Sequence, residues 1–134
     1  MATLTVEIVT PEKRILSSEA DEVVVPGAEG LFGVRPGHTA YLSVMGPGPL
    51  AVRAEGREQA FFVTGGFAEV NADKVMVLAN HAEPVERIDV PAAQQRLTEA
   101  QARLAGLAAN DPRYAAESTT VKNESARIAA ATRR

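Results

Sequence analysis

The chain has 134 residues, of which 46% are hydrophobic and 23% charged, a composition typical of one globular domain or of one domain with an appendage. The net charge of −3 offers no basic excess for nucleic acid, and the lack of cysteine excludes disulfides and thiol chemistry. Aromatic residues make up 4%, so the core must be built from Val, Leu, Ile and Ala, and no run of about 18 apolar residues predicts a membrane span.

The first part of the chain has the pattern of β-strands. Leu4, Val6 and Ile8 alternate with polar residues, which predicts a half-buried strand. A short strand is expected at 14–16, and a stronger one at 22–26, where Pro26 should end it.

The stretch 27–38 comes next and holds four glycines, a proline and a histidine. Glycine permits positive φ and proline fixes φ, so we expect a loop that keeps a specific path near the surface. A short strand at 31–34 could lie within it.

From residue 41 to 85, short apolar runs alternate with turn residues. The turn at 55–58 reads as a hairpin connection, because alternation resumes directly after it. Roughly eight to ten short strands without an intervening helix predict an antiparallel sandwich or barrel. The strands expected in this part are 41–45, 50–54, 61–63, 67–70, 74–79 and 82–85.

The hydrophobic period changes after residue 88. Asp89 is expected to cap a helix that has Pro91 in its first turn. Spacings of four and three predict one apolar seam, and a weaker stripe follows the stop at 110–112. The seam is Ala93, Leu97, Ala100, Leu104 and Leu107; the stripe is Tyr114, Val121 and Ile128, with Ser118, Ser125 and Thr132 between them. Two such helices form a hairpin, and its Ala-rich seam predicts weak docking.

Candidate chemistry is sparse. The Gly27-x-x-Gly30-x-x-Gly33 spacing lacks the GK[ST] ending of phosphate loops and opens no helix, so we expect a rigid loop that presents Glu29 and backbone to a protein partner. His38 and His81 are the only histidines, and no carboxylate-rich cluster converges with them, so no metal site is predicted. The acidic pairs Asp21-Glu22 and Glu83/Glu86 read as solvated charges, and no catalytic residue is predicted.

Several separated motifs, in the same order, resemble the epsilon subunit of bacterial F-type ATP synthases. Residues 27–38 (GAEGLFGVRPGH) are similar to its G-x-x-G-x-x-G-I-x-P-G-H signature. Residues 63–70 (VTGGFAEV) resemble its V-S-G-G-F-x-E-V strand, and 75–79 (VMVLA) its V-T-V-L-A strand. Ile88-Asp89 before an Ala-rich hairpin is similar to its C-terminal region.

The resemblance implies an antiparallel β-sandwich over residues 1–86 and a two-helix hairpin over 87–134. It also implies a non-catalytic rotor subunit that binds the gamma subunit and the ring of membrane c subunits, on the cytoplasmic face of the bacterial inner membrane. The hairpin of this family can extend into the catalytic head, formed by the alpha and beta subunits, and inhibit ATP hydrolysis. The residues expected to contact partners are Glu29, Gly33, Pro36, Gly37 and His38, with Lys122 and Arg127 meeting acidic surfaces of the head.

The sequence departs from the family pattern at two places. Ala40 stands where the family usually has Pro, which leaves that turn less constrained. Some members bind ATP through I/L-D-x-x-R-A; here Ile88 and Asp89 remain, but Ala92 replaces the Arg, which argues against ATP binding at physiological concentration. No cofactor is expected. The alternatives are a stand-alone β-sandwich that binds a ligand or a protein, and a metal-dependent enzyme of cupin type.

Overall fold

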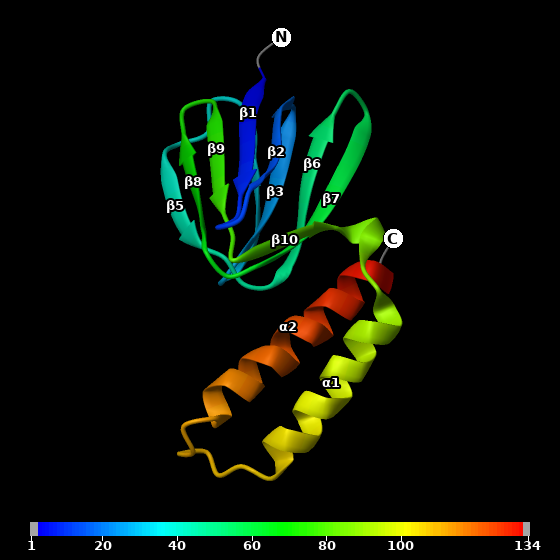
Figure 1. Ribbon diagram of the computed structural model, residues 1–134. Helices are drawn as coiled ribbons and strands as arrows, with labels where there is room; N and C mark the ends of the chain where they lie inside the picture. Colours follow the sequence, from blue (N-terminus) through cyan, green and yellow to red (C-terminus); the bar gives the residue numbers. More distant parts are fainter. Residues whose placement is uncertain (1–2, 133–134) are drawn as a thin grey trace. The chain divides into compact units, whose positions relative to one another are not determined.

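A computed structural model describes residues 3–132 of the chain. The chain divides into two compact units between Val85 and Glu86, which are described separately below. The first unit holds two five-stranded sheets, and the second holds a pair of helices (Figure 1).

The first sheet, called sheet A, has the strand order β2-β1-β9-β8-β5. Its pairings are antiparallel except for β1 and β9, which run parallel. This one parallel pair brings the start of the sandwich beside a strand that lies about 70 residues later. The strands are β1 Leu4–Val9, β2 Arg14–Ala20, β5 Tyr41–Val44, β8 Phe67–Asn71 and β9 Lys74–Leu78.

The second sheet, sheet B, has the strand order β10-β7-β6-β3-β4, and all its pairings are antiparallel. The predicted mainly antiparallel β-sandwich with a following helical hairpin is confirmed. The strands are β3 Glu22–Gly27, β4 Gly30–Val34, β6 Gly48–Ala54, β7 Arg57–Thr64 and β10 His81–Pro84.

Aliphatic side chains from both sheets form one core between the layers. Leu4, Val6 and Ile8 are fully buried, as the alternation in β1 predicts. The core continues with valines of β3, β8 and β9, and Phe61 of β7 adds an aromatic ring. Alternation therefore located the inward face correctly wherever one face of a strand is buried.

Two strands differ from the sequence-based expectation. β2 continues through the polar residues Ser17–Glu19 to Ala20, because every one of its residues pairs with β1 apart from one irregular step. Pro26 does not end β3: it lies inside the strand, opposite Leu31 of β4, beyond the stretch where β3 pairs with β6. A proline there removes no ladder donor on the β6 side.

The stretch 27–38 is not one loop. Gly27 pairs with Gly30 around the turn at Ala28-Glu29, so this stretch begins with a tight hairpin between β3 and β4. The glycine-rich spacing is therefore partly strand, and an irregular segment begins after Val34.

The 3₁₀ turn η1, Val85–Arg87, spans the boundary between the two units. Helix α1, Val90–Ala105, has the predicted cap: the Asp89 side chain accepts a hydrogen bond from the Ala92 N–H, and Pro91 lies in the first turn. Helix α2, Tyr114–Thr132, packs against α1. No helix within residues 3–132 has the length and apolar character needed to cross a membrane.

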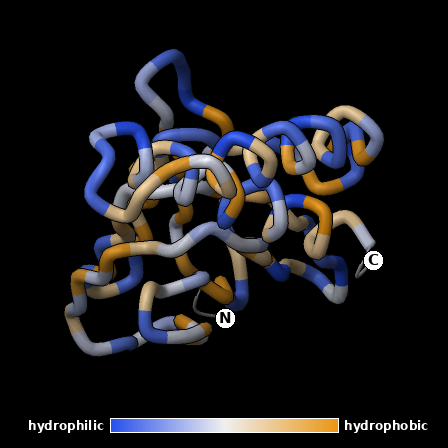
Figure 2. Tube along the Cα trace, turned by 90° about the horizontal axis from the view of Figure 1, so that it is seen from below, coloured by the Kyte–Doolittle hydropathy of each residue, from blue (hydrophilic) through white to orange (hydrophobic). Residues whose placement is uncertain are grey.

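The predicted seam of α1 is correct, since Ala93 and Ala100 are buried. The predicted stripe of α2 is partly wrong: Ser125 and Thr132 are exposed, and Glu124 and Ala130 are its buried residues. Figure 2 shows why the period is hard to read, because hydrophilic segments interrupt the apolar ones on nearly every turn of the helices.

Candidate interaction surface

The predicted partner-binding residues do not gather in one place. Glu29 lies in the turn before β4, whereas Pro36, Gly37 and His38 follow the end of β4. A strand of five residues spans about 17 Å, so the two groups lie at opposite ends of it.

The turn around His38 is fixed by hydrogen bonds. The Gly37 N–H donates to Oδ1 of Asp73 in the turn between β8 and β9, over 2.9 Å. The His38 N–H donates to the Arg35 carbonyl over 3.1 Å, and its ring Nδ1 lies 2.6 Å from the Thr39 carbonyl oxygen. These bonds give the turn a defined shape at the end of the sandwich.

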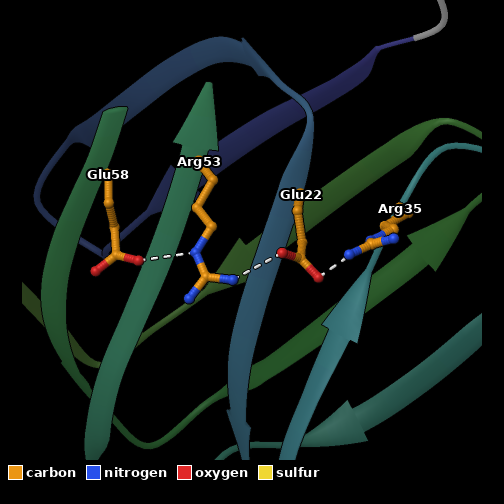
Figure 3. A network of polar contacts seen from close by, with 4 residues as sticks. All are labelled: Glu22, Arg35, Arg53 and Glu58. Carbon is orange, nitrogen blue, oxygen red and sulfur yellow. Dashed lines mark hydrogen bonds and ion pairs between the residues drawn. The ribbon is translucent and has the colours of Figure 1, made fainter. Parts of the chain in front are cut away.

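Gly33 lies within β4 and has a packing role. A Cβ at this position would come 3.1 Å from Oε2 of Glu22 on the neighbouring strand. The missing side chain leaves room for the Glu22 carboxylate, which takes part in a row of charges (Figure 3).

That row crosses sheet B. Glu58 of β7 faces Arg53 of β6, which faces Glu22 of β3, and Arg35 follows β4. Arg53 donates from Nε to Glu58 and from Nη1 to Glu22, each over 2.8 Å, and Arg35 Nε donates to Glu22 over 3.3 Å. Directly opposed charges of opposite sign favour this strand register.

The charges also change each other's protonation. The hydrogen bond from Arg53 lowers the pKa of Glu22 below its usual value of 4.5, and the bond and charge of Arg35 act the same way, against the opposing effect of burial. Hydrogen bonds to Glu58 and Glu22 raise the pKa of Arg53. Both shifts favour the ionised forms, so the row is held together by charge as well as by hydrogen bonds.

The other acidic and histidine side chains form no metal site. Among residues 3–132 no group of three or more His, Asp or Glu side chains is placed to hold an ion. His81 Nε2 lies 3.6 Å from Oε1 of Glu83, two residues along β10.

Sheet A exposes a row of apolar side chains that the sequence-based list of site residues did not include. Val44, Phe67 and Leu78 are paired across β5, β8 and β9, and they are 67%, 42% and 38% exposed. Val9 of β1 pairs with Leu78 and extends the line. We call Val9, Leu78, Phe67 and Val44 the apolar row.

More apolar side chains lie beside this row. Leu42, one pleat away on β5, is 62% exposed, and Leu31 of β4 is 63% exposed. Isolated exposed apolar residues are common, but a contiguous line over four strands marks an interaction site. The signal in the sequence was the apolar run 41–45, which has no polar alternation to solvate its second face.

A groove of about 270 Å³ opens between β4 and β5, the outermost strands of the two sheets at this side. Its rim includes Glu29, Leu42 and Val44, and Phe32 and Tyr41 meet edge to face inside it, with ring centroids 5.3 Å apart. At its end Gly27 and Met45 form an isolated antiparallel bridge, in which the Ala28 N–H donates to the Val44 carbonyl over 2.8 Å and the Gly46 N–H donates to the Pro26 carbonyl over 3.0 Å.

The remaining predicted residues lie in the second unit. Lys122 is exposed on α2. The Arg127 side chain is 13% exposed, and its Nε lies 3.2 Å from Oε1 of Glu124. Ile88 is half-buried, and Asp89 is occupied with capping α1.

Comparisons with known proteins agree on one family. The family model described as the beta-sandwich domain of the ATP synthase delta/epsilon chain matches residues 3–85. The chain is 60% identical to the ATP synthase epsilon chain of Myxococcus xanthus strain DK1622, over 98% of this chain and 96% of that one. It is 44% identical to the ATP synthase epsilon chain of Anaeromyxobacter dehalogenans strain 2CP-1, over 97% and 98%.

Two solved structures are also similar. A chain in a cryo-EM structure of the Euglena gracilis mitochondrial ATP synthase, comprising OSCP, F1 and c-ring, aligns with a TM-score of 0.85 and 25% identity, over 97% of this chain and 82% of that one. A chain in the central stalk and c-ring structure of the Tetrahymena thermophila mitochondrial ATP synthase aligns with a TM-score of 0.68 and 21% identity, over 95% and 97%. The second similarity shows the shared fold.

Proposed function

Because the chain belongs to the family of ATP synthase epsilon chains, we propose that it is a non-catalytic subunit of the central stalk of an ATP synthase. In this role it binds the gamma subunit and the ring of c subunits and turns with them. It couples the rotation of the ring to the catalytic head, and it brings no catalytic residue or resident cofactor of its own.

The observation that carries this proposal is the apolar row on sheet A. Val44, Phe67 and Leu78 are exposed in one line across three adjacent strands, and a stable partner would remove them from water. We assign this face to the gamma subunit. The turn at Pro36, Gly37 and His38 is held rigid at one end of the sandwich and adds polar contacts to that partner.

The Glu29 turn, at the other end of β4, is assigned to the c-ring. Glu29 is exposed there, and Leu31, two residues on, is 63% exposed. A carboxylate beside an apolar side chain suits a partner surface that is partly polar. Gly33 lies inside β4, where its missing side chain gives space to Glu22 in the neighbouring strand.

The location follows from these partners. We place the subunit on the cytoplasmic face of the bacterial inner membrane, attached as a peripheral part of the ATP synthase. The c-ring, and not a segment of this chain, provides the membrane attachment.

The helical hairpin is proposed to regulate ATP hydrolysis. Lys122 is exposed and available to acidic surfaces of the head formed by the alpha and beta subunits. Arg127 contacts Glu124 in the hairpin described here, so its contact with the head requires this pair to separate.

Regulatory ATP binding is not part of the proposal. Ala92 offers no cation for phosphate at the position of the motif Arg, and the Asp89 carboxylate already accepts from the Ala92 N–H. Of the motif, Ile88, Asp89 and the last Ala, Ala93, remain in place.

Co-purification tests the proposed function. The full chain, expressed with its cognate gamma subunit, should elute from a sizing column as a one-to-one complex. The same chain mixed with an unrelated stalk protein is the control. If wild-type chain and gamma elute separately at micromolar concentration, the assignment fails.

A stand-alone ligand-binding sandwich makes a different prediction. It needs a pocket of roughly 300–1,000 Å³ with converging polar groups. The β4–β5 groove, at about 270 Å³, lies below that range and is lined largely by glycine, aliphatic and aromatic residues. This groove is therefore smaller than the pocket that the alternative requires.

A further inference from the structure

The seam between α1 and α2 is built mostly of small side chains. Ala93 and Ala100 of α1 and Ala130 of α2 are buried in it. Larger apolar side chains, such as Leu97 and Val121, are half-buried. Alanine side chains are small and uniform, so they pack about equally well in several alignments of the two helices and select none of them.

A glutamate occupies the middle of this seam. Glu124 is 6% exposed, and its Oε1 accepts from Nε of Arg96, on α1, over 3.1 Å. Nε of Arg127, one turn further along α2, lies 3.2 Å from the same oxygen. We call Arg96, Glu124 and Arg127 the Glu124 triad.

A second ion pair lies toward the loop that connects the two helices. Arg103 Nε lies 2.7 Å from Oε2 of Glu117, with side chains 56% and 20% exposed. This pair is more accessible to solvent than Glu124, so water and salt weaken it more. The Arg103–Glu117 pair and the Glu124 triad form in the same alignment of α1 with α2.

A buried ion pair contributes little net stability to a folded protein. Removing a carboxylate from water costs several kcal/mol, and well-packed apolar residues of similar size often replace a buried ion pair without loss. The buried carboxylate instead raises the free energy of other alignments of the two helices. If α2 slid by one turn, about 5.4 Å, Glu124 would leave Arg96 and remain buried without its partner on the other helix.

We propose that Glu124 sets the register of the α1–α2 hairpin. It selects one alignment of two helices whose small apolar residues would tolerate several. A single buried polar residue can fix register in helix pairs in this way. The inference rests on contacts within the hairpin and is independent of the assigned role in the central stalk.

The experiment measures distances between the helices in the full chain. The sequence has no cysteine, so the double substitution Ala102→Cys and Ala129→Cys carries one spin label on each helix, at two exposed positions that are offset along the hairpin axis, so that sliding of one helix changes the distance between them. Pulsed electron resonance should show one narrow distance distribution in this background. Glu124→Leu and Glu124→Gln are then introduced, with Glu99→Leu, at an exposed glutamate of α1, as the control of equal charge change.

We expect Glu124→Leu to keep or raise the thermal midpoint while its distance distribution broadens or splits by about one helical rise per turn, roughly 5 Å. Glu124→Gln should broaden to a smaller extent, and Glu99→Leu should stay narrow. A role in stability alone would instead lower helical content and leave the distance unchanged. A single narrow distribution in both Glu124 variants overturns the proposal. If Glu124→Leu loses its helices, the distance distribution of Glu124→Gln alone tests the proposal, and a single narrow distribution in that variant overturns it.

Discussion

The backbone N–H of Gly37 donates to Oδ1 of Asp73 over 2.9 Å, which joins two turns that lie 36 residues apart. One turn follows β4 and the other connects β8 to β9. The bond links an end of sheet B to an end of sheet A. It holds the turn at Pro36–His38 in place through the carboxylate of Asp73.

Removing this acceptor should loosen the Pro36–His38 turn. Asp73→Ala leaves the Gly37 N–H without its partner, and we expect the free energy of unfolding to fall by about 1 kcal/mol. Urea unfolding measures the loss, and hydrogen exchange at Gly37 localises it. Asp73→Asn keeps an acceptor oxygen and should lose less. Equal exchange rates at Gly37 in wild type and Asp73→Ala would show that the bond does not order the turn.

Two glycines with similar backbone angles should differ sharply in their tolerance of alanine. Gly66 and Gly56 have φ of +79° and +76°. A Cβ on Gly66 would collide with the Leu78 carbonyl, whereas a Cβ on Gly56 meets open space. We expect a loss of about 1–2 kcal/mol for Gly56→Ala and of about 3 kcal/mol or more for Gly66→Ala. Chemical denaturation compares them, and equal losses would mean that the strand next to Gly66 moves aside freely.

Shortening the central side chain of the apolar row should weaken the complex with gamma. Phe67 is 42% exposed in this chain, so Phe67→Ala removes surface that only the partner covers fully. Burying a Phe contributes about 1.5–3 kcal/mol, which corresponds to roughly a 10- to 100-fold rise in Kd. Titration calorimetry with gamma measures it. Thr5→Ala, at an exposed position at the far end of the same sheet, is the control and should bind as wild type does.

The charged row on sheet B should make stability depend on pH in the acidic range. Arg53 and Arg35 lower the pKa of Glu22 in the folded chain below 4.5, so the unfolded chain binds a proton first. The stabilisation by Glu22 is therefore complete above its usual pKa and is lost as pH falls through the lowered value. The urea midpoint followed from pH 7 to pH 3 should fall less steeply in Glu22→Gln than in wild type. Identical slopes would exclude a contribution from Glu22.

The cap of α1 should control fraying at the start of the helix. Asp89→Ala removes the acceptor for the Ala92 N–H, which typically costs about 0.5–2 kcal/mol. Hydrogen exchange at Ala92 and Ala93 should accelerate, while amides of the sandwich core keep their rates. Asp89→Asn is a good cap and should restore protection. Acceleration spread evenly over the whole chain would point to global unfolding and not to the cap.

Local patterns predicted what depends on neighbours in sequence. The inward face of β1 follows from the alternation of Leu4, Val6 and Ile8, because one face of the strand is buried. The hairpin at 55–58 was predicted because alternation resumes directly after it, and Glu55 and Gly56 form its turn, both with positive φ. Asp89 and Pro91 specified the start of α1 through capping chemistry alone.

Features that depend on pairing between distant strands could not be predicted in the same way. The apolar row needs the parallel pairing of β1 with β9, and no pattern within either strand specifies its neighbour. The Gly33 position became intelligible once Glu22 was found across the strand from it. Glu124 was overlooked because a pattern search for apolar residues assigns charged residues to the solvent face.

The way the apolar row crosses sheet A has a mechanical consequence. Val9, Leu78, Phe67 and Val44 belong to four adjacent strands whose ladders run side by side. A partner bound to this row while the stalk turns would apply a shear force to the backbone hydrogen bonds between these strands. Many hydrogen bonds would then resist the force together. If the partner were bound to a single surface loop, one hairpin alone would resist the same force. The sandwich is therefore suited to carry torque as a stiff plate, with strain spread over the sheet.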